Sequence, residues 1–411
     1  MTTTAVTAPS RLRIALILGA LIALGPLTID TYLPALPDVG RDLVASEPVV
    51  QLTLTGTLAG LALGQLVIGP LSDAYGRRRL LLAGTAVHVL ASALVALAPS
   101  IEVLAVLRVL QGVGASAGAV IGLAVVRDLF TGRAAATMLS RLILVMGAFP
   151  VLAPTLGAAL LNWVSWRGVF LFLAGYGLVM LVVVTSGLPE TLPPRRRRSA
   201  RFGPTLRTYG GLLRDRTFVG LVLVAGLAMG ALFSYVSGAA YVYQQQFGMD
   251  QQTFGIAFGA GAIWLVVGTQ LNPVLLRRVE PRRVMSTAVA AGVLVGLVLA
   301  VLTATGTGGL PAVLAGVWAL LLACGFVLPN APALALARHG ESAGTASALL
   351  GSLQFGIGAA TSPVVGLLGN DAAAMGTAMF GAIALAGIAL VGVARPWTLP
   401  DLNEEPELAT A

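Results

Sequence analysis

The chain contains twelve long apolar stretches, separated by short segments that carry charged residues or turn-forming glycine and proline. A helix needs about 20 residues to cross the hydrocarbon core of a bilayer, and most of these stretches reach that length. Backbone polar groups in lipid must be bonded within the spanning segment, and apolar runs this long meet that need as helices. The sequence therefore predicts an all-α integral membrane protein with twelve transmembrane helices. We expect spans at 12–37, 50–72, 80–98, 101–125, 137–161, 167–187, 217–243, 253–276, 284–305, 310–336, 343–367 and 372–394.

The composition excludes a water-soluble globule, because only 10% of the residues are charged and soluble domains carry about 25%. We expect the first span to be a retained helix and not a cleaved signal peptide. One cysteine, Cys324, and two histidines, His88 and His339, are too few for a disulfide or a histidine metal centre. The sequence has no phosphate loop, zinc-ligand pair or nucleophile elbow. We therefore expect no catalytic site, no metal and no cofactor; a membrane-embedded lipid enzyme is the alternative of a different class.

All 25 basic residues are arginines, and their placement predicts the orientation of the chain. If both termini are cytoplasmic, every arginine except three falls in a cytoplasmic segment. The exceptions are Arg41 and Arg167 outside and Arg108 within a span. The positive-inside rule therefore favours cytoplasmic termini. The net charge of +8 is explained by this topology, and we expect a lipid bilayer as partner and no nucleic acid.

The longest polar segment, 189–216, divides the apolar spans into two sets of six. We expect an N-terminal half at 1–188, a cytoplasmic linker at 189–216, a C-terminal half at 217–395 and a disordered cytoplasmic tail at 396–411. The linker is interpreted as a solvated tether. The alternative is a short helix that lies on anionic lipid.

Two charged residues lie inside the predicted spans, Asp30 in the first and Arg108 in the fourth. Each is about seven residues from the outer boundary, or roughly 10 Å deep at ~1.5 Å per residue. A charge at this depth costs about 2.5–3.5 kcal/mol and usually has a function. Burial favours the neutral acid and a nearby arginine favours the carboxylate. We therefore predict that Asp30 and Arg108 meet and serve proton coupling; the alternative is a permanent structural ion pair.

The short run between the second and third spans, at a helix junction, contains Gly69, Asp73, Gly76 and Arg77. The first glycine is expected to allow close helix approach and the second a tight turn. The run resembles the cytoplasmic motif of the major facilitator superfamily, G-x-L-[SA]-D-x-x-G-R-[RK]. In that family the acid and the arginine join a second acid at the end of span four, and the network holds the outward-facing state. Asp128 occupies that place; the alternative is that the arginines only fix topology.

Further motifs extend the resemblance over nearly the whole chain. Gly147, Pro150, Pro154 and Gly157 form a relaxed version of the superfamily's antiporter motif, with alanine at two positions where glycine is usual. Small residues and prolines permit tight packing and a bend. Arg108 belongs to an R-x-x-Q-G element similar to the span-four motif.

The run around Asp30 resembles the D-x-Y-L-P-A-x-P element of the Bcr/CflA drug-resistance subfamily. The resemblance implies a monomeric, proton-driven exporter of small amphipathic drugs in the inner membrane, built as two six-helix halves that alternate access. A proton-coupled transporter of a metabolite or nutrient with the same fold is the alternative. Some relatives carry a second acid two turns earlier, where this chain has Ile22, so the coupling role falls on Asp30.

Six residues within the spans are candidates for the substrate cavity, because an amphipathic drug needs apolar walls with a few polar or aromatic contacts. The alternative for each is packing or, for Tyr241, an aromatic belt at the membrane interface. His88 is interpreted as a satisfied interior histidine, with a proton relay as the alternative, and Glu190 as the end of span six. The six candidates are Tyr32, Gln111, Tyr235, Tyr241, Trp264 and Gln354.

Overall fold

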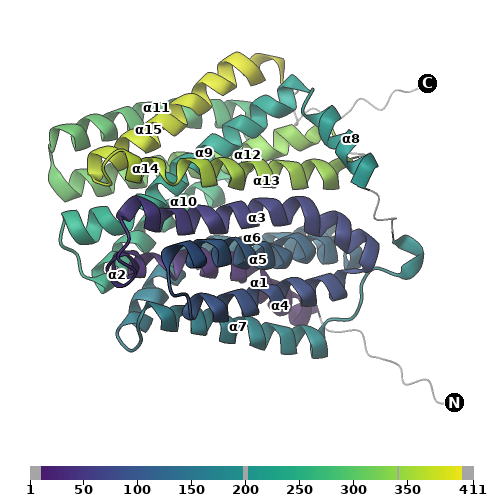
Figure 1. Cartoon of the computed structure of the whole chain (residues 1–411). Coiled ribbons are helices and arrows are strands. Elements are labelled where there is room, and N and C mark those ends of the chain that lie inside the picture. Colours follow the sequence, from purple (N-terminus) through teal and green to yellow (C-terminus); the bar gives the residue numbers. More distant parts are fainter. Residues whose placement is uncertain (1–10, 198–201, 340–341, 400–411) are drawn as a thin grey trace.

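The computed structural model describes residues 11–197, 202–339 and 342–399. The polar leader and most of the tail predicted to be disordered, residues 400–411, lie outside the described residues. Within the described ranges, 12 helices are long and apolar enough to cross a membrane. The predicted number of spans is therefore confirmed, and Figure 1 shows these helices lying side by side.

The helices follow the predicted spans closely. In the first half they are α1 (Arg11–Asp30), η1 (Leu33–Ala35), α2 (Leu36–Asp42), α3 (Glu47–Tyr75), α4 (Arg77–Ala96), α5 (Ile101–Leu129), α6 (Gly132–Leu161) and α7 (Trp166–Gly187). In the second half they are α9 (Arg216–Ala240), η3 (Tyr241–Gln246), α10 (Gln251–Leu275), α11 (Pro281–Thr305), α12 (Gly309–Ala337), α13 (Ala343–Thr361), α14 (Val364–Leu367), α15 (Ala372–Ala389) and η5 (Leu390–Ala394).

The first span departs from the prediction because it is not one continuous α-helix. α1 ends at Asp30, and the chain continues through a turn into η1 and α2. Pro34 and Pro37 lack the N–H groups that would bond the carbonyls of Asp30 and Leu33, so two hydrogen bonds of a continuous α-helix are missing at this point. Asp30 therefore lies at the end of a helix, beside an irregular backbone.

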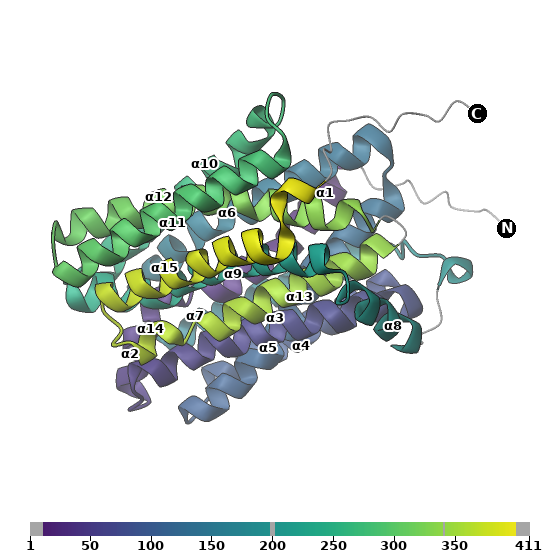
Figure 2. The same cartoon turned by 90° about the horizontal axis from the view of Figure 1, so that it is seen from above.

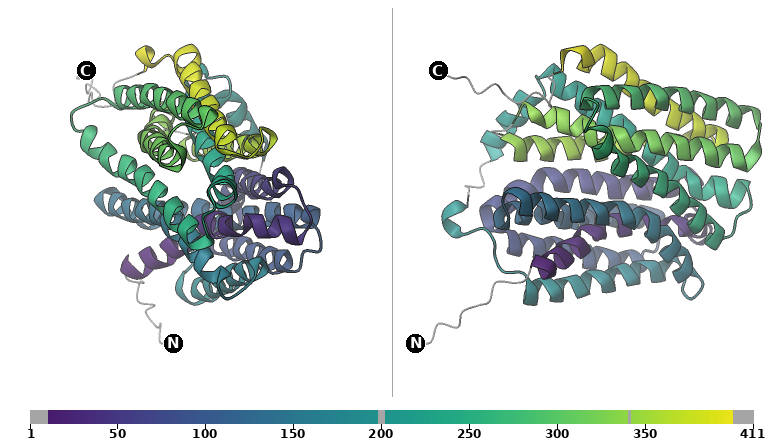
Figure 3. Two further views of the ribbon diagram at one scale, coloured as in Figure 1. Left: turned by 90° about the vertical axis from the view of Figure 1, so that its left-hand side faces the viewer. Right: turned by 180° about the vertical axis from the view of Figure 1, so that it is seen from behind.

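The helices pack as two halves that are joined by two helix pairs. α1 and α3–α7 form one bundle, and α9–α13 with α15 form the other, seen below and above in Figure 1. α3 packs against α13, and α6 packs against α10 (Figure 2 and Figure 3). The linker contains η2 (Pro194–Arg196) and α8 (Phe202–Leu212), and α8 packs against α13. The linker is thus partly helical, as the alternative reading of 189–216 requires.

The described chain begins and ends at the same end of the bundle, on the right in Figure 1. We call this the terminal end and its opposite the far end. At the far end, hydrogen bonds join the halves: Gln51 Nε2 donates to Ser237 O at 3.1 Å and to Asn370 Oδ1 at 2.6 Å. Asn370 Nδ2 in turn donates to Glu47 Oε2 at 2.5 Å. The two halves are therefore held together at the far end.

Candidate functional site

Asp30 is buried between the two halves without an ionic partner. Its side chain is 6% exposed, and within the described residues no hydrogen bond or ion pair is found for its carboxylate. Tyr235 of α9 lies within electrostatic range of the Asp30 carboxyl. A buried carboxyl without a partner is costly, so it persists where a function needs it. The structure thus singles out Asp30, as the sequence did.

Arg108 is also fully buried, but its guanidinium bonds to groups other than the Asp30 carboxylate. Its Nη1 donates to Thr28 O at 3.0 Å and to Gln111 Oε1 at 2.6 Å. The guanidinium lies over the rings of Tyr32, at 4.8 Å, and Phe170, at 5.4 Å. Cation–π contacts replace part of the lost hydration. Arg108 Nε and Nη2 have no hydrogen-bond partner among the described residues.

The predicted meeting of Asp30 and Arg108 is therefore not found in this structure. Among the described residues, no carboxylate lies within 4.0 Å of the Arg108 guanidinium. Arg108 instead bonds to Thr28 O in α1 and to Gln111 in α5, both within the first half, whereas Tyr235 of α9 in the second half lies within electrostatic range of Asp30. The proton-coupling role assigned to the two residues stays a prediction.

A ring of hydrogen bonds holds Arg108 in place. Gln111 Nε2 donates to Ser92 Oγ at 2.7 Å, and Ser92 Oγ donates to His88 O at 2.7 Å. His88 Nε2 lies 2.8 Å from Thr28 Oγ1. The Thr28 carbonyl closes the ring on Arg108. The ring ties α1, α4 and α5 together around an arginine that has no counter-ion there.

The bonds of Thr28 identify the protonation of His88. The hydroxyl of Thr28 lies 2.6 Å from Leu24 O, and because a carbonyl only accepts, the hydroxyl proton is used there. His88 must therefore donate from Nε2, which leaves Nδ1 buried and without a partner. His88 is only half satisfied, in contrast to the fully satisfied interior histidine that we expected.

Unpartnered polar atoms gather in the second half on the side of Asp30. The hydroxyls of Tyr235, Tyr241 and Tyr243 are buried without a hydrogen-bond partner, and so is Trp318 Nε1 of α12. The ring of Tyr235 stacks on Phe258 with centroids 4.8 Å apart. Each unpaired buried donor costs roughly 1–3 kcal/mol. Such a group of donors suits a site that is completed by a ligand or by water.

The remaining cavity candidates are divided by the structure. Tyr32 is buried, with its hydroxyl 3.2 Å from Thr53 Oγ1, and Gln111 uses both ends of its amide in the Arg108 ring. Gln354 of α13 is half-buried. Trp264 is 40% exposed and shares a face of α10 with Leu271, which is exposed as well. This exposed apolar face of α10 does not support the expectation that Trp264 lines a cavity.

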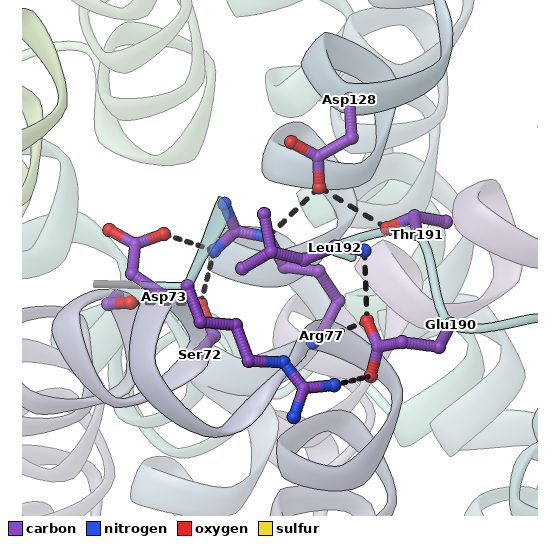
Figure 4. Close-up of polar contacts among 9 residues, drawn as sticks. Ser72, Asp73, Arg77, Asp128, Glu190, Thr191 and Leu192 are labelled. Carbon is purple, nitrogen blue, oxygen red and sulfur yellow. Dashed lines mark hydrogen bonds and ion pairs between the residues drawn. The ribbon is translucent and has the colours of Figure 1, made fainter. Parts of the chain in front are cut away.

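The charge network predicted around Arg77 is present at the terminal end (Figure 4). Arg77 Nη1 lies 2.6 Å from Asp73 Oδ1, and its Nε lies 3.0 Å from Asp128 Oδ2. Ser72 Oγ accepts a further bond from Nη1 at 2.5 Å. The network joins α3, α4 and α5, which all belong to the first half.

The start of the linker completes this network in a way that the sequence did not reveal. Glu190 Oε1 accepts from the backbone N–H of Arg77 at 2.9 Å and from Leu192 N at 3.0 Å, and Thr191 Oγ1 donates to Asp128 Oδ2 at 3.2 Å (Figure 4). A carboxylate at the first N–H groups of α4 also meets the positive end of the helix dipole. Glu190 thus caps α4, beyond its predicted role at the end of span six.

The two glycines of this motif have different roles. Gly76 has φ +100°, and a Cβ there would lie 2.4 Å from Glu190 Oε2, so the predicted tight turn is confirmed. A Cβ on Gly69 would meet Val120 at an ordinary 3.8 Å. The expectation that Gly69 is needed for close helix approach is therefore wrong.

The span-five motif lies at two helix contacts. A Cβ on Gly157 would lie 2.1 Å from Thr31 O, directly after Asp30, whereas one on Gly147 would lie 3.3 Å from Val266 of α10. Pro150 and Pro154 lie inside α6 between these contacts. The predicted tight packing is present, and it joins α6 to the first span and to the second half.

The chain is similar in sequence to known membrane transporters. Residues 16–363 match the family model described as Major Facilitator Superfamily. The chain is 37% identical to an uncharacterized MFS-type transporter, YdgK, of Bacillus subtilis over 95% of this chain and 97% of the relative. It is 30% identical to a bicyclomycin resistance protein homolog of Haemophilus influenzae over 87% and 90%. It is 32% identical to a chloramphenicol resistance protein of Pseudomonas aeruginosa over 76% and 71%.

Solved structures share the fold at low identity. The xylose transporter XylE from E. coli, in a partially occluded inward-open conformation, matches with a TM-score of 0.73 and 12% identity over 96% of this chain and 99% of that one. The human organic anion transporter MFSD10 matches with a TM-score of 0.70 and 19% identity over 93% and 100%. These likenesses concern the arrangement of the twelve helices.

Proposed function

This chain belongs to the major facilitator superfamily and is related to Bcr/CflA-type drug transporters, and we propose that it exports small amphipathic drugs in exchange for protons. It is a multi-pass protein of the inner membrane. The observation that carries the proposal is the buried carboxyl of Asp30, which lies between the two halves without an ionic partner. The relatives named for drug resistance support the substrate class.

Asp30 is the group that carries the proton in this proposal. A carboxyl in a site of low polarity gains or loses its proton when hydration or a bound cation changes, because these alter the cost of its charge. Protonation from outside is coupled to drug release, and deprotonation inside favours drug loading. Arg108 adds a fixed positive charge at similar depth in the same half.

Alternating access follows from the two halves. With the termini in the cytoplasm, as the arginine distribution favours, the far end faces outward. The bonds that Gln51 and Asn370 make across the halves then keep the outer side closed, which suits an inward-facing state. Rocking of the halves exchanges these contacts for others. The network around Arg77 and Asp128 lies at the opposite, cytoplasmic end and within the first half, and it is formed in this state as well. Its proposed gating role, to favour the outward-facing state, therefore requires further contacts with the second half that form when the cytoplasmic end closes. The protein acts as a monomer.

A growth experiment tests the substrate class directly. The gene is expressed in a host that lacks its own efflux pumps, and growth is measured across chemically varied drugs with and without a protonophore. We expect raised resistance to several amphipathic drugs that is lost when the proton gradient is abolished. Unchanged resistance to every drug, together with gradient-dependent uptake of a metabolite, would instead identify a nutrient transporter of the same fold.

A further inference from the structure

We propose that Tyr235 and Trp318 form a pair of hydrogen-bond donors that binds an acceptor oxygen of the substrate, such as an amide carbonyl. This inference rests on the proposed function and adds the chemistry by which the second half recognises its substrate. Neither the relatives nor the sequence motifs place a binding group on α12. Trp318 was absent from the candidates that the sequence offered.

The two donors converge on Gly261 of α10. A Cβ on Gly261 would lie 3.0 Å from the hydroxyl oxygen of Tyr235 and 3.2 Å from Trp318 Nε1. Tyr235 of α9 and Trp318 of α12 therefore meet beside Gly261 of α10. Both distances are shorter than an ordinary van der Waals contact, so the two donor atoms pack directly against the backbone of α10 at Gly261, where a larger residue would press on both.

Both donors are buried and lack a partner in the described protein. Tyr235 is 1% exposed, and neither its hydroxyl nor Trp318 Nε1 meets hydrogen-bond geometry with any described group. The ring of Tyr243 lies 6.4 Å from that of Tyr235, centroid to centroid, and its hydroxyl also lacks a hydrogen-bond partner among the described residues. A tryptophan N–H can only donate, so what satisfies Trp318 must be an acceptor.

The surroundings define the rest of the ligand. Phe258 stacks on Tyr235 with an interplanar angle of 13°, and Phe254 packs on Phe258 at 5.8 Å, so one wall is aromatic. Asp30 lies within electrostatic range of Tyr235. The class that fits is a molecule with an aromatic body and a carbonyl, nitro or amide oxygen. A cation without an acceptor oxygen can pair with Asp30 and pack on the aromatic wall, but it cannot accept hydrogen bonds from the two donors.

Binding to the purified full-length protein in detergent tests the pair with two probes. Chloramphenicol carries an amide carbonyl and a nitro group; tetraphenylphosphonium or ethidium, whichever the wild type binds, carries no acceptor oxygen. The variants Tyr235→Phe and Trp318→Phe each remove one donor and keep the ring. Trp264→Phe on the exposed face of α10 is the matched control. Gly261→Ala keeps both donors, but its methyl group would press on both donor atoms and displace them.

We expect Tyr235→Phe and Trp318→Phe each to weaken chloramphenicol binding by about fivefold, the equivalent of one neutral hydrogen bond. Binding of the oxygen-free cation should stay within about twofold. Gly261→Ala should weaken chloramphenicol in the same way, and Trp264→Phe should change neither probe. Equal losses for both probes, or no loss for chloramphenicol, would overturn the donor pair. A wild type that binds no drug at all would instead refute the proposed function.

Discussion

Gly157→Ala should destabilise the protein strongly, because it places a methyl group against the backbone that follows Asp30. The new Cβ would lie 2.1 Å from Thr31 O. An ordinary contact between a carbon and an oxygen is about 1 Å longer, so α6 and the first span must separate by roughly that distance. Closely packed interiors resist such shifts, and overpacking costs about 1–3 kcal/mol. The clash is with backbone, so no side-chain rotation relieves it.

Gly147→Ala on the same helix is the matched control. Its Cβ would lie 3.3 Å from a methyl group of Val266, which can move by a few tenths of an ångström. Replacing glycine by alanine within a helix also gains up to about 1 kcal/mol from helix propensity. Both glycines lie inside α6 and share this gain. We therefore expect Gly147→Ala to stay within about 1 kcal/mol of the wild type, and Gly157→Ala to be about 1–3 kcal/mol less stable than Gly147→Ala.

Thermal unfolding of the purified variants in the same detergent measures this difference, and drug transport shows its effect on the site. Gly157→Ala should melt well below both Gly147→Ala and the wild type, and its transport should fall because the displaced segment holds Asp30. If the two alanine variants melt together and transport equally well, the close approach of α6 to the first span is refuted.

The remaining predictions concern the two ends of the bundle and the Arg108 ring. Asp128→Asn should lower the stability measured by thermal unfolding by about 1–2 kcal/mol, and Asp73→Asn should lower it less. The Asp73 side chain is 41% exposed against 18% for Asp128, so water screens its ion pair with Arg77 more strongly. Equal losses for the two variants would contradict this. Gln51→Ala removes the bond to Asn370 and should raise labelling of far-end cysteines by a water-soluble maleimide; unchanged labelling would mean that other contacts keep this end closed. His88→Gln, which keeps a donor, should retain the pH profile of transport, whereas His88→Leu should shift it; a lost profile in His88→Gln would make the histidine a proton relay.

The number of helices and the Arg77 network could be predicted because both depend on local sequence. Length and hydropathy define a membrane span without any knowledge of its neighbours. Asp73 and Arg77 are four residues apart across one helix junction, and they meet in the structure at 2.6 Å. Asp128 is 51 residues from Arg77, and its part in the network was expected only from the resemblance to the superfamily motif.

The direction in which Asp30 points could not be predicted in the same way. Counting residues gives depth in the membrane, but not the rotation of a helix about its axis. Counting predicts the same depth for Asp30 and Arg108, yet Arg108 bonds to Thr28 O and Gln111, and no ion pair between the two is found among the described residues. The two prolines after Asp30 also end α1 there, which changes the direction of the backbone.

Sequence also could not show that Trp318, and not Trp264, lies beside the buried donors, because it does not give the rotation of a helix about its axis. Trp264 and Trp318 both lie in long apolar helices, where hydrophobic residues cover every face and give no amphipathic signal. Packing places Trp318 against Gly261 and leaves Trp264 40% exposed. Glu190 was underestimated for a related reason, since its partner Arg77 is 113 residues away in the sequence.

The most direct test of the account compares two kinds of transport by Asp30→Asn in proteoliposomes. One assay measures drug accumulation driven by an imposed pH gradient, and the other measures exchange of labelled for unlabelled drug without a gradient. Asparagine keeps the size of the side chain but cannot carry a proton. We expect gradient-driven accumulation to be lost while exchange continues. Accumulation at the wild-type rate, with its full dependence on the pH gradient, would show that Asp30 does not couple protons to transport.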